Sequence, residues 1–123
     1  MAKSCGRPPR STLEVFEDHL ELRLADRVDD DIERNYDPHV LLLGNGGIFH
    51  GHEGIRACAS SLASELPQAR FRYVRKLVEG EIAFLEWTAT GEGGRINDGV
   101  DTFLIRDGHI VAKTVRYTVT KPE

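Results

Sequence analysis

The chain has few of the features that mark specialised classes of protein. Only two cysteines occur in its 123 residues. No disulfide framework is expected from them, so Cys5 and Cys58 are interpreted as reduced thiols of a cytoplasmic protein. No apolar run approaches the ~20 residues of a membrane-spanning helix. The N-terminal segment has no apolar stretch of the kind that forms a secretory signal, and a membrane is not an expected partner.

Positive charge is not concentrated anywhere along the chain. The net charge is -4, and the basic residues are scattered. Nucleic-acid binding is therefore not expected, because it usually requires a concentrated positive surface. His50, His52 and Glu53 lack a well-placed further ligand for zinc, and residues 29–31 lack the glycine and distal glutamate of a calcium loop. We expect no metal and no cofactor.

Helix signals dominate the first half of the chain. Residues 1–10 are predicted to be a disordered leader, and residues 11–120 a single domain. Ser11 and Glu14 form a capping box that predicts a helix start. The apolar stripe of that helix is predicted to be Leu13, Phe16, Leu20 and Leu24. His19 lies beside this stripe and is expected to be exposed to solvent, the alternative being a place at the mouth of a pocket. The acidic residues 29–31 are interpreted as the solvated start of a second, short helix.

Strand signals with a period of two dominate the second half. Residues 71–78 and 81–88 flank a predicted turn at Glu79-Gly80, and a second hairpin turns near Asp107-Gly108. A third helix, ended by Pro67, precedes these strands. The order predicts an α+β fold, with helices covering one face of a curved, mostly antiparallel sheet.

The first hairpin suggests which side chains face inward. A regular two-residue turn places Tyr73 opposite Glu86 and on the same face as Phe84. This face holds the larger apolar groups and is the predicted interior, which leaves Trp87 on the outer face. A slip of one residue would exchange the two faces. The alternative for Glu86 is a solvated residue paired with Arg72 or Arg75.

Asp101 is the leading candidate for a functional residue, because it interrupts an apolar strand. A carboxylate at such a position is costly unless it is paired, hydrogen-bonded or neutral. A three-residue turn at 106–108 places Lys113 opposite Asp101, with Phe103 and Tyr117 on the same face. A two-residue turn would instead place residues 112, 114 and 116 beside it. The structural alternative for Asp101 is an ion pair with Lys113.

Two segments resemble one known family. The strand and helix entry at 49–56, and the hairpin from Asp101 to Ile110, resemble the SnoaL-like branch of the NTF2-like superfamily; the likeness extends from Ser11 to Val119. The resemblance implies a cone-shaped fold, in which a curved sheet wraps a long N-terminal helix and leaves a pocket at its open end. It also implies a homodimer. Polyketide cyclases, steroid isomerases and non-enzymatic binding domains share this fold, so the fold alone does not decide function.

Residues carried over from ketosteroid isomerases match only in part. Asp101 resembles the acid that donates to the oxyanion, and Tyr117 the pocket aromatic of the last strand. Leu20 stands near the position of the oxyanion-hole tyrosine, and Gly44 near that of the base. Steroid isomerisation by that mechanism is therefore not expected.

The expected function is binding of a small apolar molecule that carries a carbonyl or hydroxyl. If the protein is an enzyme, it is expected to catalyse cofactor-free cyclisation, isomerisation or dehydration, with Asp101 and Glu86 as acid and base. Hydrolysis by activated water would need a further polar group beside Asp101. The alternative is a non-catalytic ligand-binding or dimerisation module. The predicted ligand-binding residues are Tyr73, Tyr117, Phe16, Leu20, Phe84, Phe103 and Lys113.

Overall fold

A computed structural model describes residues 8–122, so Cys5 and most of the predicted leader lie outside the described residues. The helices are α1 (Thr12–Leu24), α2 (Val28–Asn35) and α3 (Gly51–Glu65). The strands are β1 (Tyr36–Gly44), β2 (Gly47–His50), β3 (Arg70–Glu79), β4 (Ile82–Gly91), β5 (Gly94–Arg106), β6 (His109–Arg116) and β7 (Val119–Thr120).

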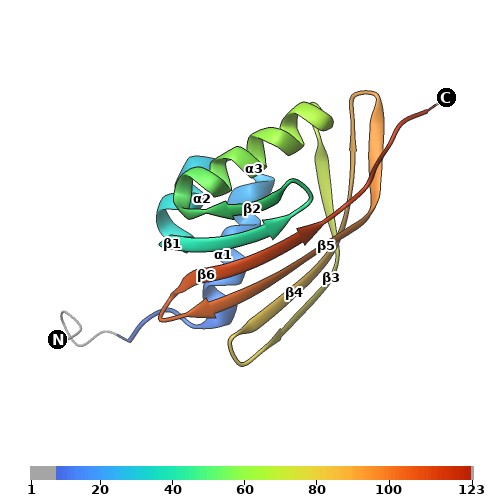
Figure 1. Ribbon diagram of the computed structural model, residues 1–123. Coiled ribbons are helices and arrows are strands. Elements are labelled where there is room, and N and C mark those ends of the chain that lie inside the picture. The colour runs from blue at the N-terminus through green and yellow to red at the C-terminus, as the bar shows by residue number, and fades with distance from the viewer. Residues whose placement is uncertain (1–7, 123) are drawn as a thin grey trace.

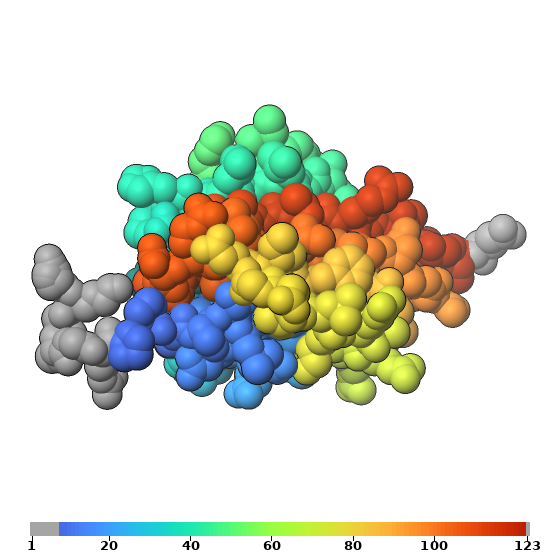
Figure 2. Space-filling view, turned by 90° about the horizontal axis from the view of Figure 1, so that it is seen from below, coloured from blue at the N-terminus to red at the C-terminus, as the bar shows by residue number. Residues whose placement is uncertain are grey.

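The strands form one open, curved sheet in the order β2-β1-β6-β5-β4-β3, with β7 paired to β5 (Figure 1). Only β1 and β6 run parallel, and the remaining pairs are antiparallel. Helix α1 lies against β3, β4 and β5, whereas α3 covers β1 and β2. Figure 2 shows α1 in blue beside the β3–β4 hairpin in yellow. The predicted α+β class and mostly antiparallel sheet are confirmed.

The first helix begins where the sequence predicts, and a tertiary contact holds the chain just before it. Ser11 and Glu14 form the predicted capping box, in which each side chain accepts a hydrogen bond from the other residue's backbone N–H. Arg10, in the last position of the predicted leader, donates hydrogen bonds to Asn35 Oδ1 and to the carbonyl oxygens of Arg34 and Gly108. These contacts join the start of α1 to α2 and to the β5–β6 turn.

The buried face of α1 differs from the predicted stripe. Phe16 and Leu20 are buried, but Leu13 and Leu24 are more than half exposed. His19, predicted to be exposed, is buried instead. The reason is that α1 packs against α2 as well as the sheet, so its buried face is turned relative to the simple stripe.

The β3–β4 hairpin has a different register from the predicted one, and the predicted interior face of β4 is wrong. Its turn lies at residues 80–81, and Val74 forms a bulge between Tyr73 and Arg75. The bulge places Tyr73 on the opposite face from Leu77, whereas a regular ladder would group them together. Residues 83, 85, 87 and 89 of β4 face inward and are buried, and Tyr73 shares their face.

The β5–β6 hairpin has a two-residue turn followed by a bulge. Asp107 and Gly108 both have positive φ angles, 52° and 79°, as a tight hairpin turn requires. The register shifts after Ile105, so that Asp101 pairs with Val115 and Lys113 pairs with Phe103. Neither predicted register is correct. Relative to the register predicted from a three-residue turn, the partner of Asp101 is shifted by two residues, from Lys113 to Val115. An even shift preserves the face, so Asp101 and Lys113 still lie on one face as predicted.

No helix among residues 8–122 is long and apolar enough to cross a membrane. The homodimer and the cytoplasmic location expected from the sequence stay predictions.

Candidate functional site

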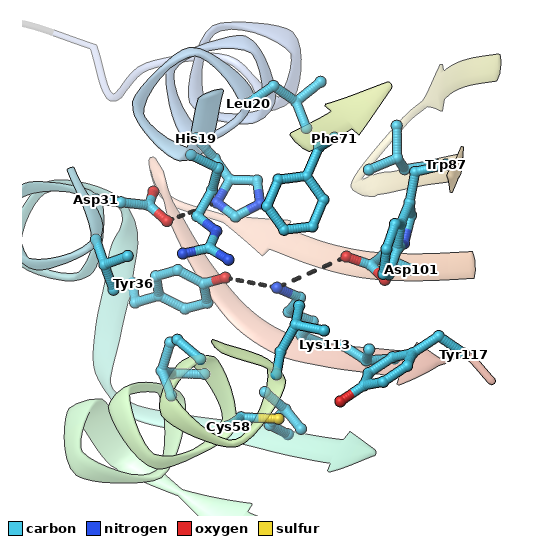
Figure 3. Close-up of a pocket in the computed structure, with 18 of the residues that line it drawn as sticks. His19, Leu20, Asp31, Tyr36, Cys58, Phe71, Trp87, Asp101, Lys113 and Tyr117 are labelled. Carbon is cyan, nitrogen blue, oxygen red and sulfur yellow. Dashed lines mark hydrogen bonds and ion pairs between the residues drawn. The ribbon is translucent and has the colours of Figure 1, made fainter. Parts of the chain in front are cut away.

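A cavity of about 70 Å³ lies between the inner face of the sheet and the three helices (Figure 3). Its wall is mostly apolar. Aromatic side chains come mainly from the strands of the sheet, and aliphatic side chains come from α3. A small group of polar side chains interrupts this wall: His19, Arg23, Asp31, Tyr36, Asp101 and Lys113. Concave apolar sites with a few convergent polar groups are typical of small-molecule binding.

Asp101 and Lys113 form the polar centre of the sheet side of this cavity. The indole Nε1–H of Trp87 donates to Asp101 Oδ1 at 2.9 Å, and Lys113 Nζ lies 3.8 Å from Asp101 Oδ2. Lys113 Nζ also donates to the Tyr36 hydroxyl at 3.0 Å. The side chains of Lys113 and Asp101 are only 11% and 10% exposed. The carboxylate and the ammonium therefore face each other in a largely dry environment.

The strand register explains why these three groups meet. Leu85 of β4 pairs with Asp101, and Trp87 pairs with Gly99, two residues earlier on β5. Because Gly99 has no side chain, the indole lies over its backbone and reaches Asp101. The bulge in β6 places Lys113 opposite Phe103, two residue pairs along the ladder from Asp101 and on the same face, within reach of its carboxylate.

Lys113 is a cation in the wall of the cavity. Burial opposes its charge, but the Tyr36 oxygen and the Asp101 carboxylate outweigh this effect and raise the pKa of the ammonium above its usual value. Its Nζ also lies 5.1 Å from the centre of the Phe103 ring and 5.6 Å from that of Tyr36. Burial raises the pKa of Tyr36 to about 12, so its hydroxyl is neutral and accepts from Lys113.

The two other tyrosines at the cavity already use their hydroxyl groups. The Tyr73 hydroxyl donates to the Leu20 carbonyl oxygen at 2.9 Å, and the Tyr117 hydroxyl donates to Glu65 Oε1 at 2.5 Å. Burial raises the pKa of both phenols. Cys58 also borders the cavity, and burial raises the pKa of its thiol, which disfavours the reactive thiolate.

The structure brings together only part of the predicted site. Among the predicted residues, the cavity is lined by Asp101, Lys113, Tyr73, Tyr117 and Leu20. Phe16 and Phe103 are buried behind it, with their rings 5.4 Å apart.

Glu86 and Phe84 lie on the other face of β4, so the predicted pairing of Glu86 with Asp101 in one pocket is not formed. The prediction fails because the Val74 bulge places Tyr73 opposite Trp87 instead of Glu86. Trp87, predicted to lie on the outer face, is buried.

Sequence reasoning missed a second polar pair at the cavity. His19 Nδ1 lies 2.8 Å from Asp31 Oδ2, and the two residues are only 3% and 1% exposed. The interpretation of Asp31 as part of a solvated helix start is therefore wrong. A signal existed in the spacing: His19 follows Phe16 by three residues and Val15 by four, the spacing of a shared helix face.

A methyl group at Gly99 is expected to displace Trp87. A Cβ there would overlap the indole ring. We expect Gly99→Ala to lower the free energy of unfolding by about 1–3 kcal/mol, as overpacking does, and to shift the fluorescence of the single tryptophan to longer wavelength. The matched control is Val100→Ala, the next residue on β5, which should leave the emission unchanged. Unchanged emission of Gly99→Ala would contradict this arrangement.

The buried His19 is expected to make stability depend on pH. Burial lowers the pKa of His19; Asp31 opposes the shift, whereas Lys113 and Arg23 add to it. An unfolded imidazole titrates near 6.5, so below about pH 6.5 the unfolded chain binds more protons than the folded chain. The free energy of unfolding should therefore decrease as the pH falls from 7 to 5.5.

Urea unfolding at the two pH values measures this decrease. The variant His19→Gln should show a smaller decrease than the wild type, and the exposed-site control His39→Gln should match the wild type. Equal slopes for the wild type and His19→Gln would show that His19 is not the group responsible.

Comparison with solved structures finds the same fold in proteins of low sequence identity. One, from Sinorhizobium meliloti and provisionally named a polyketide cyclase, has a TM-score of 0.71 and 15% identity, over 83% of this chain and 93% of that chain. Another, from Kribbella flavida and provisionally named a ketosteroid isomerase, has a TM-score of 0.71 and 15% identity, over 91% of this chain and 81% of that chain.

A de novo designed protein with a curved β-sheet is equally similar, with a TM-score of 0.72 and 17% identity over 87% of this chain and 84% of that chain. At these identities the likeness shows the fold alone. No curated protein matches the chain. The family described as the SnoaL-like domain matches residues 16–113, which is most of the chain. The chain therefore belongs to the SnoaL-like domain family.

Proposed function

We propose that this protein binds a small, mostly apolar carbonyl compound in the cavity and moves a proton on it without a cofactor. The observation that carries the proposal is the Asp101–Lys113 pair: a carboxylate and an ammonium, each about nine-tenths buried, in the wall of an apolar cavity. The provisional names polyketide cyclase and ketosteroid isomerase, given to two proteins of this fold, support a carbonyl-containing ligand.

The two charges have different tasks in this proposal. Lys113 donates a hydrogen bond to the ligand's carbonyl oxygen, where negative charge develops when the neighbouring carbon loses a proton. Asp101 takes that proton and returns it, as a general base and then a general acid. A fixed cation acts more strongly in a water-poor cavity than in bulk solvent, because the surrounding dielectric is low. Glu86 has no role in this proposal, since it faces away from the cavity.

The cavity volume limits the ligand. A volume of about 70 Å³ is less than half of the ~150 Å³ of an engineered cavity that binds benzene. The part of the ligand held inside is therefore a short chain or small ring with few carbon atoms. A larger molecule would have to extend out of the cavity or displace side chains of its wall.

A second candidate, ligand binding without turnover, is favoured by one observation. Asp101 already accepts from Trp87 and faces Lys113, so both of its oxygens have protein partners. Neither oxygen can then take a proton from a ligand unless one of these contacts is given up. In that case Asp101 fixes Lys113, and Lys113 alone binds the carbonyl oxygen.

Exchange of carbon-bound protons tests the proposal without knowledge of the natural ligand. The probe is butanone in D₂O, whose protons next to the carbonyl are followed by NMR. We expect the wild type to accelerate exchange, and Asp101→Asn to slow it by about 10²-fold or more, the usual contribution of a general base. The control Glu79→Gln, exposed at the end of β3, should exchange at the wild-type rate.

Equal rates for the wild type and Asp101→Asn would show that Asp101 does not move the proton. A wild type that binds butanone, seen as saturable changes in its NMR spectrum, but exchanges no protons would support the second candidate.

A further inference from the structure

His19 and Asp31 form a polar pair that the proposed function does not use. They come from α1 and α2, on the helix side of the cavity, whereas Asp101 and Lys113 come from the sheet (Figure 3). His19 Nδ1 lies 2.8 Å from Asp31 Oδ2, and both residues line the cavity while being almost fully buried. The ring of His19 packs edge to face against Tyr36 and Phe103, at 5.8 and 5.1 Å between ring centres, so its orientation is fixed.

The hydrogen bonds of Asp31 determine which nitrogen of His19 carries the proton. Asp31 Oδ1 accepts from Asn35 Nδ2 at 2.9 Å, and Oδ2 faces the imidazole. Burial opposes the charge of Asp31, but His19 and Asn35 outweigh it and keep the pKa of this carboxyl below its usual value. An ionised carboxylate only accepts, so Nδ1 carries the proton that it donates to Asp31.

The other nitrogen of His19, Nε2, is turned toward the cavity in Figure 3. Burial lowers the pKa of the ring, so the imidazole is neutral near pH 7 and Nε2 holds a lone pair. The cavity then has two polar ends, Lys113 Nζ on the sheet side and His19 Nε2 on the helix side. Lys113 can only donate hydrogen bonds, whereas Nε2 of neutral His19 can only accept them.

Both polar ends lie against the same aromatic ring. The Phe103 ring centre is 5.1 Å from Lys113 Nζ and 5.1 Å from the centre of the His19 ring. A ligand that uses both ends needs an acceptor and a donor close together, as a carbonyl and a hydroxyl on adjacent carbon atoms provide. We propose that the ligand is an α-hydroxyketone, whose hydroxyl donates to His19 Nε2 and passes its proton through that nitrogen. This inference rests on the proposed function for the placement of the carbonyl at Lys113.

The proposed reaction exchanges the positions of the carbonyl and the hydroxyl. Asp101 takes the proton of the hydroxyl-bearing carbon, the C–H electron pair forms a C=C bond, and the carbonyl π pair moves onto the oxygen at Lys113. The hydroxyl proton passes by way of Nε2 to that oxygen. The electron pair left on the former hydroxyl oxygen then forms the new C=O bond. The C=C electron pair takes the proton back from Asp101 at the former carbonyl carbon. No oxidant is needed, and Asp31 acts as a positioning residue.

Two probes of similar size test this inference: butanone, and 3-hydroxybutanone with ¹³C at its carbonyl carbon. In the wild type we expect proton exchange in butanone and movement of the label to the hydroxyl-bearing position of 3-hydroxybutanone. His19→Gln should slow movement of the label by about 10²-fold but change butanone exchange by less than about threefold, because butanone has no hydroxyl. Asp101→Asn should slow both reactions.

The outcomes separate this inference from the proposed function. The inference is overturned if the wild type exchanges butanone protons but moves no label, or if His19→Gln slows both reactions equally. The proposed function is overturned if Asp101→Asn slows neither reaction, or if the wild type performs neither.

A second variant and a second measurement cover the case in which His19→Gln does not fold. In Asp31→Asn the amide donates to Nδ1 and reverses the tautomer, so label movement should stop while butanone exchange continues. Independently of any reaction, ¹⁵N NMR of the wild type should show the Nδ1-protonated ring with Nε2 unprotonated. A proton on Nε2 near pH 7 would contradict the inference.

Discussion

The buried charge of Lys113 is the constraint on which the cavity depends. An ammonium taken out of water is costly unless other groups compensate it, and removal of one partner from such an arrangement is usually severely destabilising. Here the compensation comes from Asp101, the Tyr36 hydroxyl and the faces of two aromatic rings. Asp101 is in turn held by Trp87, which lies over Gly99. One lysine thus explains the identity of residues on β1, β4 and β5.

The helix side of the cavity is organised by hydrogen bonds that reach the start of the described chain. Arg10 donates to Asn35, Asn35 donates to Asp31, and Asp31 holds His19. The residue order alone does not reveal this connection, because it joins three separate segments through side chains. His19 has the spacing of the buried helix face, but a lone histidine in that position gives no indication of its partner.

How far the sequence predicts the site depends on how regular the strands are. A three-residue turn at 106–108 predicts that Asp101 and Lys113 share one face. The shared face is confirmed, although the turn has two residues and a bulge in β6 restores the face relation. The same reasoning fails for Glu86 and Trp87, because the Val74 bulge reverses the face relation between the two halves of β3. Bulges depend on tertiary contacts and leave no clear local signal. The fold class is more robust, since helix caps, turns and the order of elements together specify it.

We propose that a small carbonyl compound binds beside Asp101 and Lys113. The most direct measurement uses the only tryptophan of the chain, whose indole N–H gives a single ¹H–¹⁵N NMR signal. That proton is donated to Asp101, so a ligand at the pair changes its environment. Titration with butanone should shift the Trp87 indole signal in a saturable manner. An indole signal that stays unchanged while other signals report saturable binding would place the ligand elsewhere and contradict the account.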